Sequence, residues 1–480
     1  MLDRLFHLSE NRTRVRTELL AGLTTFLTMA YIIFLQPAVL SGTLFGMSTG
    51  MDFGAVMVAT CVSAALATAI MGLYARYPIA QAPGMGENFF FVLSAMPAAA
   101  AMIQSQIAAG AMEEGATGPW QIALGVVFLS GVLFLILSLV GLREMILDSV
   151  SPSMRNGIAV GIGLFIAFIG LKSAHLIHGD QGTLVKLNPH FTSPDLIVFF
   201  VGLIVTAALQ ARRVPGSILW GIAAALVLTL ALHYGLPASW RESRPVAESM
   251  LAKQFVVDTR VVAAPPSLAP TAFKLDLRNA LSWPMVPFIL IFLFMVLFDT
   301  LGTLIGIGEQ AGFIKDDKLP RAKQALVSDA LASVVGASLG TSTVTSFIES
   351  AAGVEQGGRT GLTAVTVAVL FLLAIFFSPL IAMVGSYPPI TAPALVVVGS
   401  MMFWNVTKIE WSNYAEAMPA FLIVLGIPLT FSIGDGLALG FIFYPVVKLL
   451  AGQGRQVRPV MYVLAALLVG YFAFVRVCAG

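Results

Sequence analysis

The sequence has few charged residues for its length. Only 11% of its 480 residues are charged, whereas soluble globular proteins carry roughly 25%. Even a large soluble domain covers its surface with charge, and 58% of this chain is hydrophobic. We therefore expect a multi-pass protein of the plasma membrane, with the lipid bilayer as its solvent. The formal net charge of +2 gives no reason to expect a nucleic-acid partner.

Residues of metal, redox and nucleophilic chemistry are also scarce. The two cysteines, Cys61 and Cys478, offer neither a ligand cluster nor a disulfide framework. The five histidines lie in loops and at polar ends of apolar runs, not in a metal or nucleophile–base constellation. No phosphate-binding GxxxxGK[ST] motif occurs. We expect no metal, no cofactor, no catalytic residues and no ATP-driven step in this chain.

Apolar runs of membrane-spanning length follow one another along the chain. A spanning helix needs about 20 mostly apolar residues, because its backbone finds no water in the bilayer. The predicted runs are Leu20 to Leu40, Ala55 to Leu73, Trp120 to Leu142, Ser153 to Leu171, Leu196 to Leu209, Ile218 to Leu236, Pro287 to Ile307, Ala325 to Leu339, Gly361 to Val384, Thr391 to Trp404, Met418 to Ile433 and Leu437 to Leu450. A last segment, Val460 to Phe474, either spans the membrane or re-enters it.

Two further segments have membrane length but an unusual composition. Ala80 to Ala99 and Gly340 to Gly358 are rich in Gly, Ser, Thr and Pro. Irregular backbone is tolerated at membrane depth only where protein buries it or where it lines a cavity. Such interrupted segments in corresponding halves are the best sequence indication of a transporter's binding site.

The distribution of basic residues predicts the orientation. Arg12, Arg76 and Arg212 fall on the same side if the spans alternate, and the loop Ser41 to Met51 opposite them has no Lys or Arg. Because cytoplasmic loops carry excess basic residues, we expect a cytoplasmic N-terminus and a cytoplasmic Lys315 to Lys323 loop. The long connection from Pro237 to Trp283 is then external.

The two halves of the chain share a plan. Trp120 to Ile146 precedes SPSMRNGIAVGIGLFIAF, and Gly361 to Val384 precedes YPPITAPALVVVGSMMF. In each case a long apolar helix comes before a Pro-started helix and just after an irregular segment. Seven spans in each half would make the halves inverted copies, an arrangement that places the site at the bilayer midplane. The predicted fold class is an all-α polytopic membrane protein of about 14 segments in two inverted repeats.

Four carboxylates lie in or beside the apolar segments, where ionisable groups are costly and rare. Asp299 is in FLFMVLFDTLGTLIG, Glu349 in GTSTVTSFIESAAG, Glu87 in AQAPGMGENFFF, and Asp329 in the helix before the second irregular segment. Each is a candidate for binding or for proton transfer. The alternative is a structural one, in which the carboxylate caps a broken helix or bonds a neighbouring backbone.

Small and hydroxylated residues around these carboxylates complete the candidate binding site. Gly86 allows close approach of backbone to a ligand, and Thr343 and Ser346 offer hydroxyls and amides. Asn88 adds an amide, and Phe89 is one of three consecutive phenylalanines that can stack on a ring. Two of those three are expected in the core. Tight helix packing is the alternative reason for the glycines elsewhere in the chain.

These stretches resemble a known family, the AzgA-like guanine/hypoxanthine permeases of the nucleobase transporter superfamily. The matching stretches are LLAGLTTFLTMAYIIFLQPAVL, APGMGENFFF, GIGLFIAFIGLK, PPSLAPTAFKLD, LFDTLGTLIG and GTSTVTSFIESAAGVEQGGRTGLTAV. They occur in order from the first span to the eleventh, so the resemblance covers nearly the whole chain.

The resemblance implies two domains, each formed by two separate parts of the chain. A core domain would comprise residues 1–146 and 286–384, and a gate domain residues 147–236 and 385–452, with 237–285 as the external connection and 453–480 as a C-terminal apolar segment. Short antiparallel strands in segments 3 and 10 would meet at the substrate. The family also suggests a homodimer.

By the same resemblance the substrate is a purine nucleobase, adenine, guanine or hypoxanthine, carried with a proton by alternating access. Asp299 and Glu349 match the acidic positions that bond the base and couple protons, and Asp329 is a further candidate for proton coupling. Two positions depart from the family pattern: Glu87 stands where Leu is usual, and Val296 where an acidic residue is usual. The alternative function is transport of an anion or another small metabolite on the same fold.

Overall fold

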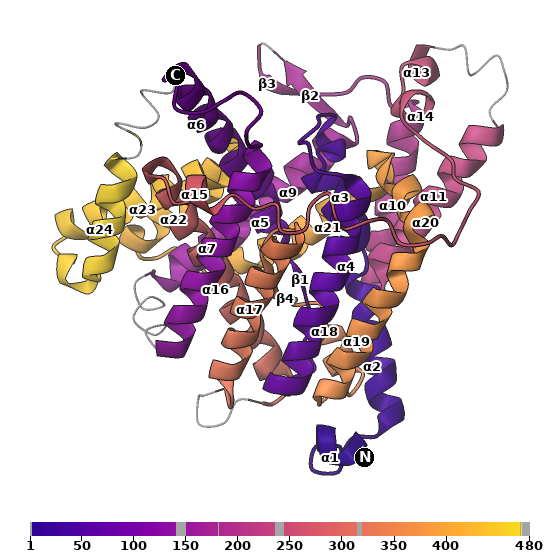
Figure 1. The fold of residues 1–480 in the computed structure, drawn as a ribbon, viewed down its shortest axis with the longest axis horizontal. Coiled ribbons are helices and arrows are strands. Elements are labelled where there is room, and N and C mark those ends of the chain that lie inside the picture. The colour runs from indigo at the N-terminus through magenta and orange to yellow at the C-terminus, as the bar shows by residue number, and fades with distance from the viewer. Residues whose placement is uncertain are drawn as a thin grey trace.

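The computed structural model describes residues 2–140, 150–180, 182–235, 244–313, 319–470 and 472. Within these ranges, eleven helices are long and apolar enough to cross a membrane. The predicted Lys315 and Lys318, and the end of the segment Val460 to Phe474, lie outside the described residues. Figure 1 shows the helices side by side in one bundle, with α1 (Leu2–Phe6) at one end and the hairpin of β2 (Ile177–Asp180) and β3 (Leu184–Leu187) at the other.

The elements of the first half alternate long helices with one broken segment. They are α1 (Leu2–Phe6), α2 (Val15–Met29), α3 (Ile32–Leu40), α4 (Phe53–Ile70), β1 (Gln81–Pro83), α5 (Met85–Phe90), α6 (Met96–Ala108), α7 (Pro119–Val140), α9 (Pro152–Ser173), α10 (Pro194–Ala211) and α11 (Ser217–Gly235). A π-helical turn, Phe91–Ala95, joins α5 to α6 in one continuous helix.

The second half repeats this order. Its elements are α16 (Val286–Gln310), α17 (Ala322–Leu339), β4 (Val344–Ser346), α18 (Ser350–Glu355), α19 (Gly361–Ala374), α20 (Ser378–Gly385), α21 (Pro388–Phe403), α22 (Tyr414–Thr430), α23 (Ile433–Leu450) and α24 (Pro459–Gly470). The predicted helical fold with short strands in segment 3 (Ala80 to Ala99) and segment 10 (Gly340 to Gly358) is confirmed, because β1 and β4 fall in these two segments.

The two strands pair with each other across the middle of the molecule. β1 and β4 are antiparallel, with Ala82 opposite Thr345. Backbone groups that the short strands leave over are satisfied by hydroxyls, since Thr68 Oγ1 donates to the Gln81 carbonyl at 3.0 Å and Ser333 Oγ to the Val344 carbonyl at 3.0 Å. The Ser- and Thr-rich composition therefore supplies the hydrogen bonds that lipid cannot.

The helices pack in equivalent pairs in the two halves. α7 lies against α17, and α19 lies correspondingly against α4, while α9 crosses α21. The last crossing is close: a Cβ on Gly163 would stand 2.8 Å from the Gly399 carbonyl oxygen. Small residues at such crossings let helix backbones approach within a membrane.

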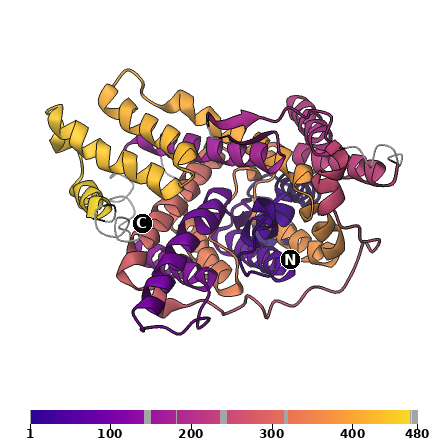
Figure 2. The same ribbon diagram turned by 90° about the horizontal axis from the view of Figure 1, so that it is seen from above.

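The long connection between the halves runs along the outside of the bundle (Figure 2). It contains α13 (Arg244–Ala247), α14 (Met250–Lys253) and α15 (Leu277–Ala280). Its backbone amides bond to several helix ends, with Ala263 N–H on the Phe376 carbonyl at 2.9 Å, Phe273 N–H on Ser338 at 2.7 Å and Asp276 N–H on Gln121 at 2.9 Å. At its other end Asp195 accepts from the Met250 amide at 2.9 Å. The connection is therefore fixed to the bundle at several points between Met250 and Asp276.

Three predicted segments are interrupted or short. The run Leu20 to Leu40 is divided, because α2 ends at Met29 and α3 begins at Ile32. α22 and α23 are separated at Phe431, whose φ of 55° is left-handed and rare for a bulky residue. The described part of α24 has 12 residues and ends at Gly470, beside a residue outside the described ranges.

Candidate functional site

Asp299 lies in the middle of α16, level with the paired strands. Its Oδ2 accepts from Thr345 Oγ1 of β4 at 3.2 Å. The side chain is exposed although the neighbouring Val296 and Thr300 are buried. Asp299 therefore faces accessible space within the fold, as a ligand-binding carboxylate must.

Glu87 approaches the same strand residue from the opposite repeat. Its carboxylate folds back over Gly84, where a Cβ would overlap Glu87 Oε2 and lie 2.8 Å from Thr345 Cγ2. Only a glycine leaves room for this arrangement. Thr345 thus has the Glu87 carboxyl group near its methyl group and the Asp299 carboxylate at its hydroxyl.

Glu349 immediately precedes α18 and is held by the first span. The Tyr31 hydroxyl donates to Glu349 Oε1 at 2.6 Å. Glu349 is half-buried, and its charge also acts on Asp299. Three of the four predicted carboxylates therefore lie around one point where the two irregular segments meet.

Asp329 differs from the other three carboxylates in its surroundings. It is fully buried and accepts from Gln81 Nε2, from Thr300 Oγ1, from the Ser346 amide at 3.2 Å and from Ser346 Oγ at 2.8 Å. These donors come from β1, α16 and β4. Asp329 thus ties the strand pair to two helices, which is the structural reading that the sequence left open for it.

Asn88 is enclosed in a buried amide network. Its Nδ2 donates to Gln36 Oε1 and its Oδ1 accepts from Ser342 Oγ, while Gln36 Nε2 donates to Thr341 Oγ1 at 2.8 Å. All four residues are buried. The structure places Asn88 between α3 and the start of the second irregular segment, where its amide has protein partners.

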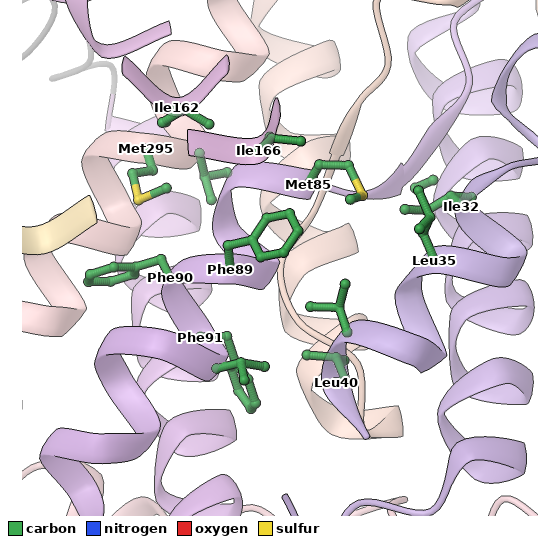
Figure 3. Close-up of a cluster of buried hydrophobic side chains, with 14 of the residues drawn as sticks. Ile32, Leu35, Leu40, Met85, Phe89, Phe90, Phe91, Ile162, Ile166 and Met295 are labelled. Carbon is green, nitrogen blue, oxygen red and sulfur yellow. The ribbon is translucent and has the colours of Figure 1, made fainter. Parts of the chain in front are cut away.

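The remaining predicted residues divide between the strands and the core. Gly86 packs on α9, where a Cβ would stand 3.0 Å from Ile162 Cγ2. Thr343 is buried, and among the described residues its hydroxyl has no hydrogen-bond partner. Phe89 is fully buried between Phe45 and Phe165, with ring centroids 6.0 and 6.2 Å away. Figure 3 shows Phe89 and Phe90 pointing away from each other within the hydrophobic cluster.

Accessible positions near Asp299 lie on one side of the strands. Gly302, one turn further along α16, is exposed with open space around it, and Ile348 after β4 is 51% exposed. A Cβ on Gly306 would meet Ile348 at 3.5 Å. α16 runs from these residues toward the end of the molecule that carries α1 (Figure 1). Gly302 and Ile348 are thus accessible residues close in sequence to Asp299 and to β4.

Tyr31 and Gln36 are the site residues that the sequence reasoning missed. Both lie in the first span, in MAYIIFLQPAVL. An amide in an apolar run was a usable signal, because a buried polar side chain requires a partner. The partner itself, 300 positions or more along the chain, was not visible without the fold.

Comparisons with known proteins agree with this architecture. Residues 16–439 match the profile Xan_ur_permease, described as Permease family. The guanine/hypoxanthine permease PbuG of Bacillus subtilis is 40% identical and covers 98% of this chain and 99% of its own. The adenine permease AdeP of Escherichia coli is 37% identical, covering 99% and 96%. The transmembrane domain of the cyanobacterial bicarbonate transporter BicA is similar in structure, with a TM-score of 0.60, 13% identity and coverage of 88% and 97%.

The family match and the relatives named as permeases identify a membrane transporter, and not an enzyme. The chain belongs to the xanthine/uracil permease family. The predicted family resemblance and the multi-pass membrane location are confirmed. Among the described residues no group of three or more His, Cys, Asp and Glu is arranged to hold a metal ion.

Proposed function

We propose that this chain imports a purine nucleobase, adenine, guanine or hypoxanthine, by proton symport with alternating access. The observation that carries the proposal is the placement of Glu87 and Asp299 close to Thr345 of the strand pair, with Asp299 exposed. A purine presents ring N–H and exocyclic amine donors, and carboxylates are acceptors for both. The relatives named as guanine/hypoxanthine and adenine permeases support the substrate class.

The carboxylates also suit proton coupling. Asp299 interacts electrostatically with Glu87 and with Glu349, and like charges at short range favour sharing a proton. A base and a proton that enter together would leave the net charge of the site changed by only one unit. Asp299 and Glu349 are the proposed coupling groups. Asp329, with its four donors, has its acceptor capacity occupied by the protein.

Alternating access would move the core domain against the gate domain. Helices pack within each proposed domain. In the core domain α4 packs on α19 and α7 packs on α17, and in the gate domain α9 packs on α21 and α22. With the N-terminus in the cytoplasm, as the charge bias predicts, the accessible side of Asp299 faces inward. The structure would then be an inward-facing state of a plasma-membrane transporter. A homodimer is part of the same proposal, by analogy with the family.

Uptake of radiolabelled adenine, guanine, hypoxanthine, xanthine and uracil into a transport-deficient host tests the proposal. We expect saturable uptake of at least one purine, abolished by a protonophore. Saturable uptake that a protonophore leaves unchanged would exclude proton symport but keep the substrate class.

The second candidate function is transport of an anion or another small metabolite, favoured by the fold shared with a bicarbonate transporter. Three carboxylates around the site oppose an anion, because each repels it. Competition of labelled purine uptake by bicarbonate, sulfate and chloride separates the two functions. Inhibition by an anion and not by unlabelled purines would favour the second.

A further inference from the structure

A cavity lies between the third segment, the start of α16 and the start of α23. Its volume is about 260 Å³, a little below the roughly 300–1,000 Å³ of pockets that hold drug-sized ligands. It is lined by Ser94 and Ala98 of the third segment, Phe288 of α16, and Ser432 and Asp435 at the start of α23. The cavity therefore joins the proposed core domain to the proposed gate domain.

Phe431 also lines this cavity and shows where the cavity lies along the length of the helices. The Lys172 ammonium stands 4.6 Å above the Phe431 ring, and Lys172 belongs to the last turn of α9, just before the β2–β3 hairpin. That hairpin lies at the end of the molecule opposite α1 (Figure 1). The cavity is thus on the external side under the predicted orientation.

Phe90 separates the cavity from the carboxylate site. It lies one helical turn after Glu87, is fully buried, and packs on Phe288 and Phe292 with centroids 5.8 and 4.8 Å away. Its ring also covers the start of α23, since a Cβ on Gly434 would stand 2.9 Å from Phe90 Cε2. Phe90 is therefore the side chain between the two binding spaces.

The walls of the cavity combine the groups that a purine needs. Phe288 and Phe431 offer aromatic surface, Asp435 offers a carboxylate, and Ser94 and Ser432 form a hydroxyl pair at 3.3 Å that links the third segment to α23. This repeats the chemistry around Asp299, where a carboxylate and a hydroxyl lie within hydrogen-bond distance.

We propose that this cavity is an external antechamber that binds the transported purine before Phe90 admits it to the carboxylate site. The inference rests on the proposed function, since the ligand is the cargo. Binding here would hold the base at the boundary between core and gate while the inner site still faces the cytoplasm. Outward opening would then require the Ser94–Ser432 hydrogen bond to break and Phe90 to move off Gly434.

Protection of an introduced cysteine tests the antechamber. Ala98→Cys is placed in a chain that also carries Asp299→Asn and Cys478→Ser, so that the inner site is disabled, and intact cells are treated with a membrane-impermeant maleimide. We expect labelling of position 98, and protection by whichever of adenine, guanine and hypoxanthine the wild-type chain takes up. Adding Asp435→Asn should raise the purine concentration for half-protection about tenfold or more, the value of a hydrogen bond to a charged group.

Ala101→Cys is the matched control, because Ala101 lies one turn further along α6, is exposed and does not line the cavity. Absence of labelling at position 98, or equal protection at 98 and 101, would overturn the antechamber. Insertion of each variant is verified by labelling Val261→Cys in the exposed connection. If the wild-type chain takes up no purine the proposed function fails, whereas purine uptake without protection of position 98 refutes only the antechamber.

Discussion

Asp299 and Asp329 have opposite surroundings although both adjoin the same strand. Asp299 is exposed and accepts one hydrogen bond from the described residues, whereas Asp329 is buried and accepts four. A carboxylate needs unoccupied lone pairs to bind a ligand. Sequence reasoning assigned both to proton coupling, because each lies in or beside an apolar segment, whereas the number of donors is a property of the fold.

The first prediction concerns the two carboxylates that face the site. Asp299→Asn and Glu349→Gln keep shape and remove a charge that is costly to place in the membrane, so uptake should be lost while insertion is kept. Uptake is measured per inserted molecule at limiting and saturating purine. Normal transport by either variant at both concentrations would show that its carboxylate is not needed for binding.

The second prediction tests an exchange hypothesis. It states that Glu87 takes over the role of the acidic residue that the family usually has at position 296, where this chain has Val296. Val296 precedes Asp299 by almost one turn on α16 and is 2% exposed, and its neighbour Met295 lies 3.7 Å from a Cβ built on Gly86. Glu87→Leu should impair uptake severely, and Val296→Asp in the same chain should restore part of it and shift selectivity among purines. The two changes should be non-additive, because the groups share one task.

The structural alternative is that Glu87 only caps the helix α5. A helix cap contributes roughly 0.5–2 kcal/mol to stability. The Gly84 amide, which a capping Glu would serve, already donates to the Thr343 carbonyl at 3.1 Å. Glu87→Gln is the deciding control: it should lose most uptake under the exchange hypothesis and keep most under the capping one. Additive losses in the double variant would defeat the exchange.

At the scale of elements, the strand pair depends on Asp329 of α17. The third prediction is that Asp329→Ala lowers the free energy of unfolding by at least about 2 kcal/mol. The change leaves Gln81 Nε2 and the Ser346 amide buried without an acceptor, and each such donor costs roughly 1–3 kcal/mol. Thermal unfolding in detergent, followed by tryptophan fluorescence and size-exclusion chromatography, measures the loss.

Ser338→Ala is the control on the same helix. The Ser338 hydroxyl donates to the Val334 carbonyl at 2.7 Å within α17, so its removal should change stability by less than about 1 kcal/mol. Equal melting temperatures for Asp329→Ala and Ser338→Ala would mean that Asp329 does not hold the strands. Asp329 would then return as a candidate for proton coupling.

The elements themselves were largely predictable, and their breaks were not. Apolar length identifies a span because the bilayer fixes how many residues are needed, and the predicted runs coincide with α4, α7, α9, α16 and α21 within a few residues. The break between Met29 and Ile32 has no proline or glycine to announce it. Tertiary contacts explain it, because Tyr31 must reach Glu349 and Gln36 must reach Thr341.

At the scale of the whole molecule, α1 and the long connection lie at opposite ends (Figure 1). The fourth prediction is that a membrane-impermeant thiol reagent labels Val261→Cys on intact cells and Asn11→Cys only after permeabilisation, because the charge bias places the N-terminus inside. Val261 is 57% exposed and Asn11 is exposed. Labelling of position 11 but not of 261 on intact cells would reverse the orientation.

Two other positions, Ser249 and Asp317, are less suitable for that measurement. Ser249 is buried and caps α14, where its hydroxyl accepts from the Ala252 amide at 3.4 Å. Asp317, in the loop predicted to be cytoplasmic, lies outside the described residues. The fold therefore improves the choice of probes without changing the predicted orientation.

The pairing of β1 with β4 sets an order of events during synthesis. Thr345 follows its partner Ala82 by 263 positions, so at roughly 5–20 residues per second the ribosome supplies β4 tens of seconds after β1. Until then the main-chain groups of β1 lack their native partners in a medium without water. The newly made first repeat must therefore wait, shielded by the translocation machinery or by its own helices, and the binding site closes only as the tenth segment arrives.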